Sequence, residues 1–505
     1  MSKTPTAPYT SSRHPSDSAA KSGENTILAQ LQAGYEQHQA CDIDDALAQY
    51  LHILEEDPEN PDALYLAGVA YFQIQNFEQA ELFLESALSL APGRSDILIN
   101  LGNCRHAQSR LDGALEAYTQ AISADPTIAE AHNNQGNVLR ELGQFGEAET
   151  AFRQALTLQP DYLSAQCNLA ATLRSLGKLD EAESLARKTL ERDPTLGMAL
   201  TVLGCTLLDQ NRPDEAIAAL QKAVQLNPSD RAPYISLTKI WRQKGQIEEA
   251  LQICDSYLRL EPRDTIVLSV KALLLNEQGG AEKAKTLLDF ERFILPLQFD
   301  TAPGYNSISN FHSDLRGYVE KHPDLQYEPT LKSTRKGFQA EKLERDDAFP
   351  IEALKDIIAQ GVEQYCAQCE NMPGHPLAPP PEDLSITIWV TILPSNGYQH
   401  PHIHPSAWLS GVYYVALPQP MKDNPKSQAG WIEFGRPRDE EKYQAKPLLH
   451  YMEPQEGLMV LFPSYAFHRT IPVPDGADTG TVDSGIKDIG NEEKRISIAF
   501  DVLAG

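Results

Sequence analysis

The chain has 505 residues, which is enough for two or three domains with buried cores. It carries 70 acidic against 43 basic side chains, a formal net charge of −27, and this argues against nucleic acid as a partner because phosphate binding needs clustered Lys and Arg. No apolar run is long enough to cross a bilayer, and the seven cysteines, an odd number scattered along the chain, are typical of a reducing compartment. We therefore expect a cytoplasmic protein without membrane contact.

The first segment is rich in Ser, Thr, Pro and Ala and lacks the apolar core of a signal peptide. This composition predicts a disordered leader over residues 1–26.

A repeat with a period of 34 residues dominates the next part of the chain. Prolines recur at this interval eight times, from Pro58 to Pro296, and alanines recur in phase with them from Ala46 to Ala284. Each period reads as two apolar helices, the second of which ends near the proline. The pattern resembles the tetratricopeptide repeat and predicts an α-solenoid of about eight repeats over residues 27–298.

Asparagines also keep the repeat register. They are Asn100, Asn103, Asn134, Asn137 and Asn168. One interpretation is that Asn is merely tolerated on the surface of this repeat; the other is a ladder of amides that hydrogen-bonds a peptide backbone on the concave face. Similar ladders occur in the repeats of the O-linked N-acetylglucosamine transferase, and that resemblance implies a polypeptide ligand.

After Pro296 the periodicity stops, and residues 299–505 read as a separate domain. A helix is expected over 351–369, where Cys366 and Cys369 form a CxxC without a second pair, so a zinc site is not favoured. Short strands separated by Pro and Gly follow, at 384–390, 410–415, 458–462 and 496–500. They predict a double-stranded β-helix (jelly roll) with flanking helices, and hence a multidomain α + β chain.

Three histidines form a candidate metal site in this domain. His402 and His404 lie two residues apart in an extended segment, so both imidazoles should point to the same side. His468, at the end of another strand, would complete one face of an octahedral iron and leave positions open for substrate and oxygen.

Five short motifs together resemble the Fe(II)- and 2-oxoglutarate-dependent oxygenases of the prolyl-hydroxylase-like branch. They are His402-x-His404, Ser410 to Tyr414, Leu461 to Ser464, His468-Arg469 and Arg495 to Ser497. The resemblance implies that Fe(II), 2-oxoglutarate and O2 are used, with His402 and His468 as iron ligands. It also implies that Arg495 and Ser497 bind the distal carboxylate of 2-oxoglutarate, with Tyr414 as an aromatic donor.

The chain departs from this family in two places. The usual pattern is His-x-Asp or His-x-Glu, so either His404 is a third neutral ligand or water fills its place; Glu433 could supply a carboxylate instead. The step from His468 to Arg495 is long, which predicts a loop insertion over 475–493. Arg469 is an alternative partner for the cosubstrate.

The expected function is a dioxygenase that hydroxylates a protein or peptide recruited by the repeats, a joining that also resembles the collagen prolyl 4-hydroxylases. Three alternatives stay open: a repeat scaffold with an inactive barrel, a cupin-type protein with a different metal, and a small-molecule substrate.

Overall fold

A computed structural model of the chain describes residues 18–329, 332–370, 372, 374–394, 397–418, 428–438, 445–472 and 494–504. The chain divides into two compact units, Met1–Leu226 and Asn227–Gly505. This division falls inside the repeat array, whereas the sequence places the domain boundary between 298 and 299. None of the helices in the described ranges is long and apolar enough to cross a membrane.

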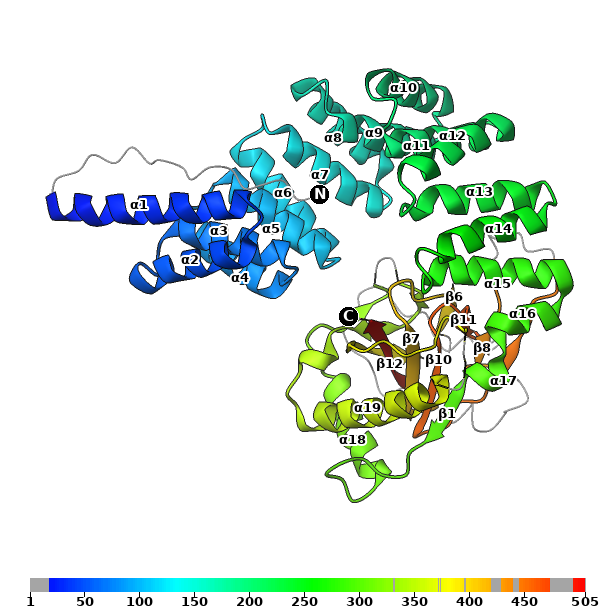
Figure 1. Ribbon diagram of the computed structural model, residues 1–505. Coiled ribbons are helices and arrows are strands. Elements are labelled where there is room, and N and C mark those ends of the chain that lie inside the picture. The colour runs from blue at the N-terminus through cyan, green and yellow to red at the C-terminus, as the bar shows by residue number, and fades with distance from the viewer. Residues whose placement is uncertain are drawn as a thin grey trace. The chain divides into compact units, whose positions relative to one another are not determined.

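The first unit is a succession of helix pairs, coloured blue to green in Figure 1. Its helices are α1 Ser18–Gln39, α2 Ile43–Glu56, α3 Pro61–Gln73, α4 Phe77–Leu90, α5 Ser95–Ala107, α6 Leu111–Ala124, α7 Ala129–Glu141, α8 Phe145–Leu158, α9 Leu163–Ser175, α10 Leu179–Arg192, α11 Gly197–Asp209 and α12 Pro213–Leu226. Helix α1 begins at Ser18, so the predicted leader is helical over 18–26; residues 1–17 lie outside the described ranges.

Small residues allow the two helices of one repeat to approach closely, as the period predicts. A Cβ atom at Gly102 would lie 2.5 Å from the ring of Tyr118 in the second helix, and one at Gly136 would lie 2.7 Å from Phe152. Both rings are fully buried, so the glycines accept the aromatic side chains that form the core of each repeat.

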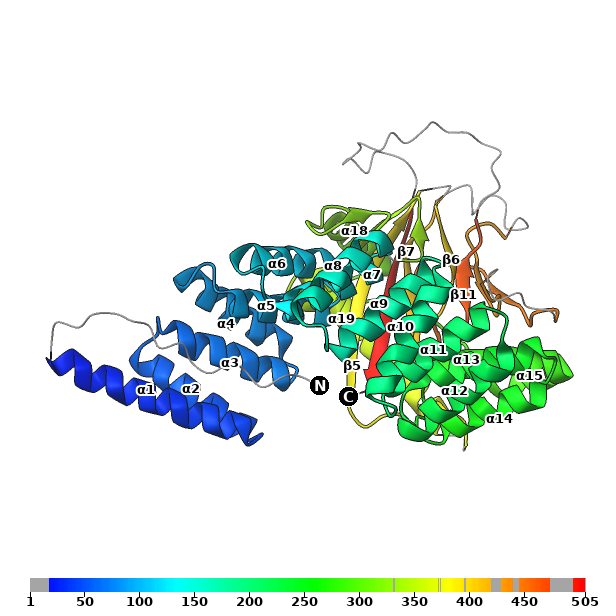
Figure 2. The same cartoon turned by 90° about the horizontal axis from the view of Figure 1, so that it is seen from above.

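The second unit begins with the last helices of the repeat array, which stack in succession (Figure 1 and Figure 2). They are α13 Arg231–Gln243, α14 Ile247–Leu258, α15 Thr265–Gly279, α16 Ala281–Leu288 and α17 Phe290–Phe293. Side chains of α15 to α17, among them Leu268, Phe290 and Phe293, share one apolar cluster with the strands that follow. The last repeat therefore docks onto the β domain and belongs to its core.

Two antiparallel sheets form the β domain over the described residues. The larger sheet contains, in spatial order, β1 Leu295–Gln298, β10 Leu458–Pro463, β7 Leu409–Ala416, β12 Arg495–Ala504, β5 Leu384–Leu393, β4 Phe338–Ala340 and β2 Gln326–Tyr327. The smaller contains β3 Thr334–Arg335, β6 Tyr398–His402, β11 His468–Thr470, β8 Ile432–Phe434 and β9 His450–Met452. Helices α18 Ile308–Val319 and α19 Phe349–Cys369 and the 3-10 turn η1 Leu343–Arg345 accompany the sheets.

The predicted fold class, an α-solenoid followed by an antiparallel β domain with flanking helices, is confirmed. The predicted helix over 351–369 corresponds to α19, and Cys366 and Cys369 are free thiols near its end. The predicted insertion over 475–493 lies outside the described residues. Sequence reasoning missed β1, which carries the chain from the last repeat straight into the edge of the larger sheet.

Candidate metal centre

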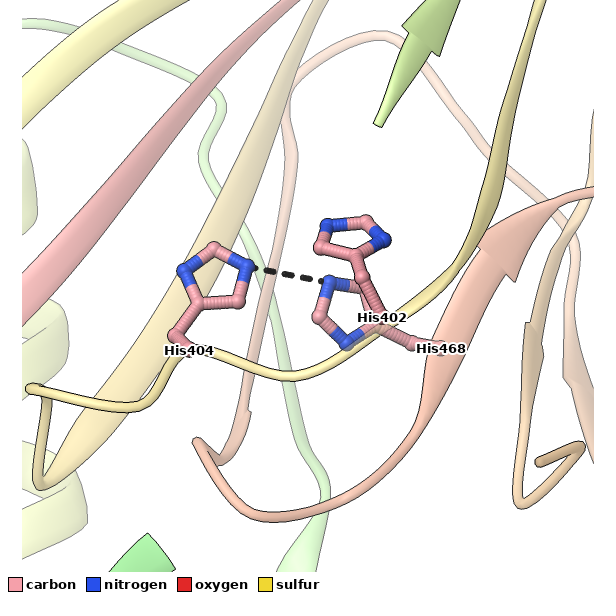
Figure 3. Close-up of side chains that lie close together, drawn as sticks. All are labelled: His402, His404 and His468. Atoms are coloured by element: carbon pink, nitrogen blue, oxygen red, sulfur yellow. Dashed lines mark hydrogen bonds between the residues drawn. The ribbon is translucent and has the colours of Figure 1, made fainter. Parts of the chain in front are cut away.

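Strand pairing in the smaller sheet brings two of the three histidines together. His468, the first residue of β11, lies directly opposite His402, the last residue of β6. His404 follows two residues beyond β6, and its backbone N–H donates to the carbonyl of Ser464 at 3.0 Å. The hydrogen bond fixes the short segment after β6, so all three imidazoles point toward one another (Figure 3).

Backbone carbonyls determine which ring nitrogen carries the proton in His402 and His468. Nδ1 of His402 lies 2.8 Å from the carbonyl oxygen of His400, and Nδ1 of His468 lies 3.1 Å from that of Ala466. A carbonyl can only accept, so each Nδ1 must be the donor and each Nε2 carries a lone pair. The hydroxyl of Ser333, 3.3 Å from Nε2 of His402, is a suitable donor to that lone pair.

His404 is oriented by a carboxylate instead of a carbonyl. Its Nδ1 lies 2.7 and 2.8 Å from the two carboxylate oxygens of Asp501, a residue near the end of β12. The hydroxyl of Ser410 donates to the same carboxylate at 2.6 Å. A carboxylate behind an imidazole fixes the tautomer and raises the basicity of the opposite nitrogen, as it does for histidines that bind metals.

One ring nitrogen of each of the three histidines is placed where it could bind a shared metal ion. One nitrogen of each ring lies within 4.8 Å of the other two, and Nε2 of His404 is 3.3 Å from Nε2 of His468 (Figure 3). A cation bound between these two nitrogens would replace this contact by two metal–ligand bonds. Imidazole nitrogens lie about 2.1 Å from a bound divalent metal, so neighbouring ligands of an octahedral ion are about 3 Å apart.

Burial keeps two of the imidazoles in the form that binds metals. It lowers the pKa of His402 to about 3, helped by the neighbouring His404, and it lowers the pKa of His468 well below its usual value. Both rings are therefore neutral at neutral pH, with a lone pair available.

The histidines open into a cavity between the two sheets. Its lining residues are Trp389, Thr391, Gln399, His402, His404, Gly411, Val412, Ile432, Phe462, His468, Arg469, Thr470, Arg495, Ser497 and Ala499. Apolar side chains form part of the lining, while Arg495, Ser497 and Thr391 supply polar groups. This is the composition of a site for a small polar ligand whose orientation is fixed by few contacts.

Arg495 is one of two arginines that line this cavity, and it is 4% exposed. Its Nη1 donates to the carbonyl of Gly430 at 2.7 Å and to the hydroxyl of Thr470 at 3.2 Å, and its guanidinium carbon lies 5.1 Å from the centre of the Tyr414 ring. Nε of Arg495 is buried without a hydrogen-bond partner among the described residues. Burial lowers the pKa of this guanidinium, so a bound anion would stabilise its charge.

Other buried polar atoms near Arg495 also lack partners. The hydroxyls of Thr391 and Tyr414 are buried without hydrogen bonds within the described ranges. Ser497 pairs with Thr391 on one side and with Tyr414 on the other, and Ser497 and Thr391 both line the cavity. Tyr414 does not line it, so of the three predicted cosubstrate residues only Arg495 and Ser497 face the space. Buried donors that have no hydrogen-bond partner and lie beside a cation suit the carboxylate of a small dicarboxylic acid.

Glu433 is not available as an iron ligand, which corrects one alternative from the sequence. It is 1% exposed, and its two oxygens each accept from Arg436 at 2.7 Å, while Nε of Arg469 donates to the same carboxylate. Arg469 lines the cavity, but its Nε already donates to Glu433, so it is a poorer carboxylate partner than Arg495, whose Nε has no partner within the described ranges.

In the first unit, the predicted asparagines are linked to one another. Asn168 donates to Asn133 at 3.0 Å, Asn133 donates to Asn134 at 3.1 Å, and Asn134 donates to Asn103 at 3.0 Å. The hydroxyl of Tyr118 also donates to Asn103, at 2.6 Å. Much of the ladder thus joins α5, α7 and α9, and Asn133, outside the register, supplies the link that sequence reasoning missed.

The two remaining asparagines, Asn100 and Asn137, differ in how many of their side-chain donors and acceptors are hydrogen-bonded. Asn100 donates to the hydroxyl of Tyr65 and to the carbonyl of Asp96. Oδ1 of Asn137 is buried and has no hydrogen-bond partner in the described part of the chain. Asn137 is therefore the member of the ladder with the most unused hydrogen-bonding capacity.

Comparison with known proteins agrees with this architecture. Residues 387–501 match the family described as "Putative 2OG-Fe(II) oxygenase". Tetratricopeptide repeat families match residues 31–95, 76–129, 127–195, 161–229 and 207–274.

Solved structures of repeat proteins resemble part of the chain. A tetratricopeptide repeat protein from Parabacteroides merdae ATCC 43184 is 17% identical, with a TM-score of 0.45 over 50% of this chain and 100% of that one. YrrB, titled a TPR protein with an unusual peptide-binding site, is 22% identical, with a TM-score of 0.32 over 37% and 96%. A thermophilic TPR protein from Thermus thermophilus is 24% identical, with a TM-score of 0.31 over 36% and 99%. The chain thus joins tetratricopeptide repeats to a domain of the family described as putative 2OG-Fe(II) oxygenases.

Proposed function

We propose that the protein is an Fe(II)- and 2-oxoglutarate-dependent dioxygenase that hydroxylates a protein or peptide recruited by its repeats. The observation that carries this proposal is a single cavity lined both by the candidate iron ligands and by a candidate binding group for the carboxylate of 2-oxoglutarate. Three Nε2 lone pairs converge at one end, and a buried cation with an unused donor lies in the same cavity.

His402, His404 and His468 would hold the iron as three neutral ligands on one face. The usual set of two histidines and one carboxylate supplies a negative charge, which three imidazoles alone do not. Asp501, hydrogen-bonded to Nδ1 of His404, provides that charge one residue further out. We therefore include His404 among the ligands, with Asp501 as its positioning residue.

Arg495 would bind the distal carboxylate of 2-oxoglutarate through its unused donors, with Ser497 and Thr391 contributing hydroxyl groups. The apolar side chains of Val412, Ile432 and Phe462 would exclude water from the same space. Tyr414 acts indirectly, because its ring lies against the guanidinium.

Bound iron would couple the oxidative decarboxylation of 2-oxoglutarate by O2, which gives succinate and carbon dioxide, to insertion of the second oxygen atom into a substrate C–H bond. The substrate would reach the site from the repeats. Of the asparagines there, Asn137 has an unused Oδ1, whereas Asn100, Asn103, Asn134 and Asn168 would have to exchange part of their present hydrogen bonds for the substrate. A polypeptide suits these groups because each amide can both donate to and accept from a backbone. The free cysteines suit a cytoplasmic protein.

Anaerobic titration of the protein with Fe(II) and 2-oxoglutarate tests the proposal. A weak metal-to-ligand charge-transfer band, absent in His468→Ala, is expected, together with succinate formation in air. If neither the band nor succinate appears, the alternative of a repeat scaffold with an inactive barrel replaces the oxygenase.

A further inference from the structure

Contacts between a basic and an acidic side chain join the first helices of neighbouring repeats at a constant register, at every second step of the array. His106 lies 2.9 Å from Glu141, Arg174 lies 3.0 Å from Asp209, and Arg242 lies 2.7 Å from Glu277. In each pair the basic residue comes near the end of one first helix, and the acid follows 35 residues later, one repeat on.

Arg140 occupies this register in α7, but the position 35 residues later holds Ser175 instead of an acid. Ser175 bonds to a carbonyl of its own helix, at 3.2 Å from Ala171. Nε of Arg140 is buried, and no hydrogen bond or ion pair reaches it from the described residues. The register also lacks a pair at Leu208 and Gln243, but there no charged group is left behind. At Arg140 the basic residue is present without its acid, so a buried donor is left without an acceptor.

Arg140 is unusual in this acidic protein. Every other arginine that the structure describes in the first unit donates to a carboxylate or carbonyl oxygen; these are Arg94, Arg105, Arg110, Arg153, Arg174, Arg187, Arg192 and Arg212. With 70 acidic side chains in the sequence, an arginine that is left unpaired needs a reason. A buried donor without an acceptor costs stability unless a ligand supplies the acceptor.

A second orphaned atom lies beside Arg140 on the same helix. Asn137 precedes it by three residues, so the two side chains share one face of α7. Oδ1 of Asn137 is also buried without a partner in the described part of the chain. Together they offer donors for an anion and an acceptor for a backbone N–H, which are the complements of an acidic residue in an extended peptide.

We propose that Arg140 and Asn137 bind the side-chain carboxylate and adjacent backbone of an Asp or Glu within the peptide substrate. This inference deepens the proposed function, because it rests on the repeats binding a polypeptide. The linked asparagines lie on α5 and α9 at both sides of α7, so the peptide would continue in both directions and present a side chain rather than its C-terminus. A planar carboxylate matches one guanidinium, whereas a phosphoryl group would need more cations than this site holds.

Selection from a peptide library tests the assignment. The probe is a random nonapeptide library with acetylated and amidated ends, retained on the immobilised full chain and sequenced by mass spectrometry. The ratio of Asp plus Glu to Asn plus Gln among retained peptides should exceed the input ratio about tenfold. Arg140→Gln should return it to the input value, whereas Arg174→Gln, the next arginine of the register, should leave it raised.

Ser175→Asp is the second variant, since it places an acid 35 residues after Arg140, the spacing of Arg174 and Asp209, and leaves Arg140 in place. It should abolish the acidic preference without loss of the folded state, measured as an unchanged melting temperature. An acidic preference that survives in both Arg140→Gln and Ser175→Asp overturns the assignment. A second library contains no Asp or Glu but keeps its free C-terminal carboxylates. If its retention depends on Arg140, Arg140 binds a peptide C-terminus and the assignment is also overturned.

The result also separates this inference from the proposed function. Peptides retained without acidic enrichment would refute the role of Arg140 but keep the repeats as a peptide-binding surface. Failure to retain any peptide would refute both the role of Arg140 and the polypeptide substrate. The charge-transfer titration does not depend on the repeats, so the oxygenase assignment would be judged separately.

Discussion

Asp501→Asn is the most informative single change in the metal centre, because it removes a charge without removing bulk. In the native protein both carboxylate oxygens lie within 2.8 Å of Nδ1 of His404, and the side chain is 17% exposed, so solvent screens the pair little. An Asn either keeps the hydrogen bond and loses the charge, or turns its NH2 group toward Nδ1 and drives the proton to Nε2. Both outcomes weaken His404 as a ligand.

Loss of a hydrogen-bonded carboxylate behind a metal-binding histidine costs about 10- to 100-fold in metal affinity, or about 1.4–2.7 kcal/mol. We expect a loss of this size for Fe(II), and for Co(II) as an air-stable substitute. Anaerobic competition with a chromophoric chelator measures both constants, and the absorption bands of the Co(II) form report any change in the ligand set. Neither readout depends on turnover.

Two controls make the comparison specific. Ser410→Ala removes one hydrogen bond to Asp501 but leaves the carboxylate, so its effect should be only a few-fold. Glu344→Gln alters a carboxylate of the same domain that accepts from the backbone of Ile388 and should leave metal affinity unchanged. If Asp501→Asn binds Co(II) within twofold of the native protein at an unchanged melting temperature, Asp501 does not position His404.

Three further changes test other parts of the second unit. Arg495→Gln should raise the dissociation constant for 2-oxoglutarate about 10- to 100-fold in the charge-transfer titration while Fe(II) affinity stays the same; an equal effect of Arg469→Gln would contradict the choice between the two arginines. Glu433→Gln should lower the free energy of unfolding by about 3–5 kcal/mol at pH 7, since it leaves two arginines beside a buried site. Burial raises the pKa of Glu433, but its arginines hold this pKa below the usual value. The difference in unfolding free energy between Glu433→Gln and the native protein is therefore present above the unfolded-state pKa of about 4.3 and should shrink as pH falls through the folded-state pKa. Urea titrations that show a constant difference over this pH range would contradict the ion pair. A chain of residues 227–505 should unfold in one cooperative transition, whereas a chain of residues 299–505 should not. The shorter chain lacks β1 and the buried Phe290 and Phe293, and burying these two side chains contributes about 1.5–3 kcal/mol each. A cooperative transition in 299–505 would refute the shared core.

The repeats could be predicted from the sequence because each depends on local contacts repeated at a fixed spacing. The two helices of a repeat meet through Gly102 and Tyr118, or Gly136 and Phe152, which lie 16 residues apart in every case. The His402 and His468 pair is harder, since 66 residues separate them, and only the resemblance of several motifs suggested that their strands pair. The geometry of the ring nitrogens could not be foreseen, because it depends on backbone carbonyls after folding.

Asp501 and Thr391 were missed for different reasons. Asp501 lies on the face of β12 that also carries Arg495 and Ser497, since alternate residues of a strand share one face; extending the motif by four residues would have found it. Thr391 can be found only from the register of β5 against β12, which places it opposite Ser497. Arg140 was missed because an arginine without a partner can be recognised only once the partners of the other arginines are known.

The C-terminal strand gives the departure from the usual ligand set a physical explanation. Arg495 and Ser497 at its start face the cavity, and Asp501 near its end orients His404, so one strand contacts both the proposed cosubstrate and the proposed metal. Replacing a metal-bound carboxylate by a histidine moves the negative charge outward onto this strand. In the proposed centre, the carboxylate that the His-x-His motif lacks would therefore be supplied by Asp501 across the sheet boundary, 97 residues after His404. A loss of activity need not follow from the missing acid, provided that β12 stays paired with β5 and β7 along its length.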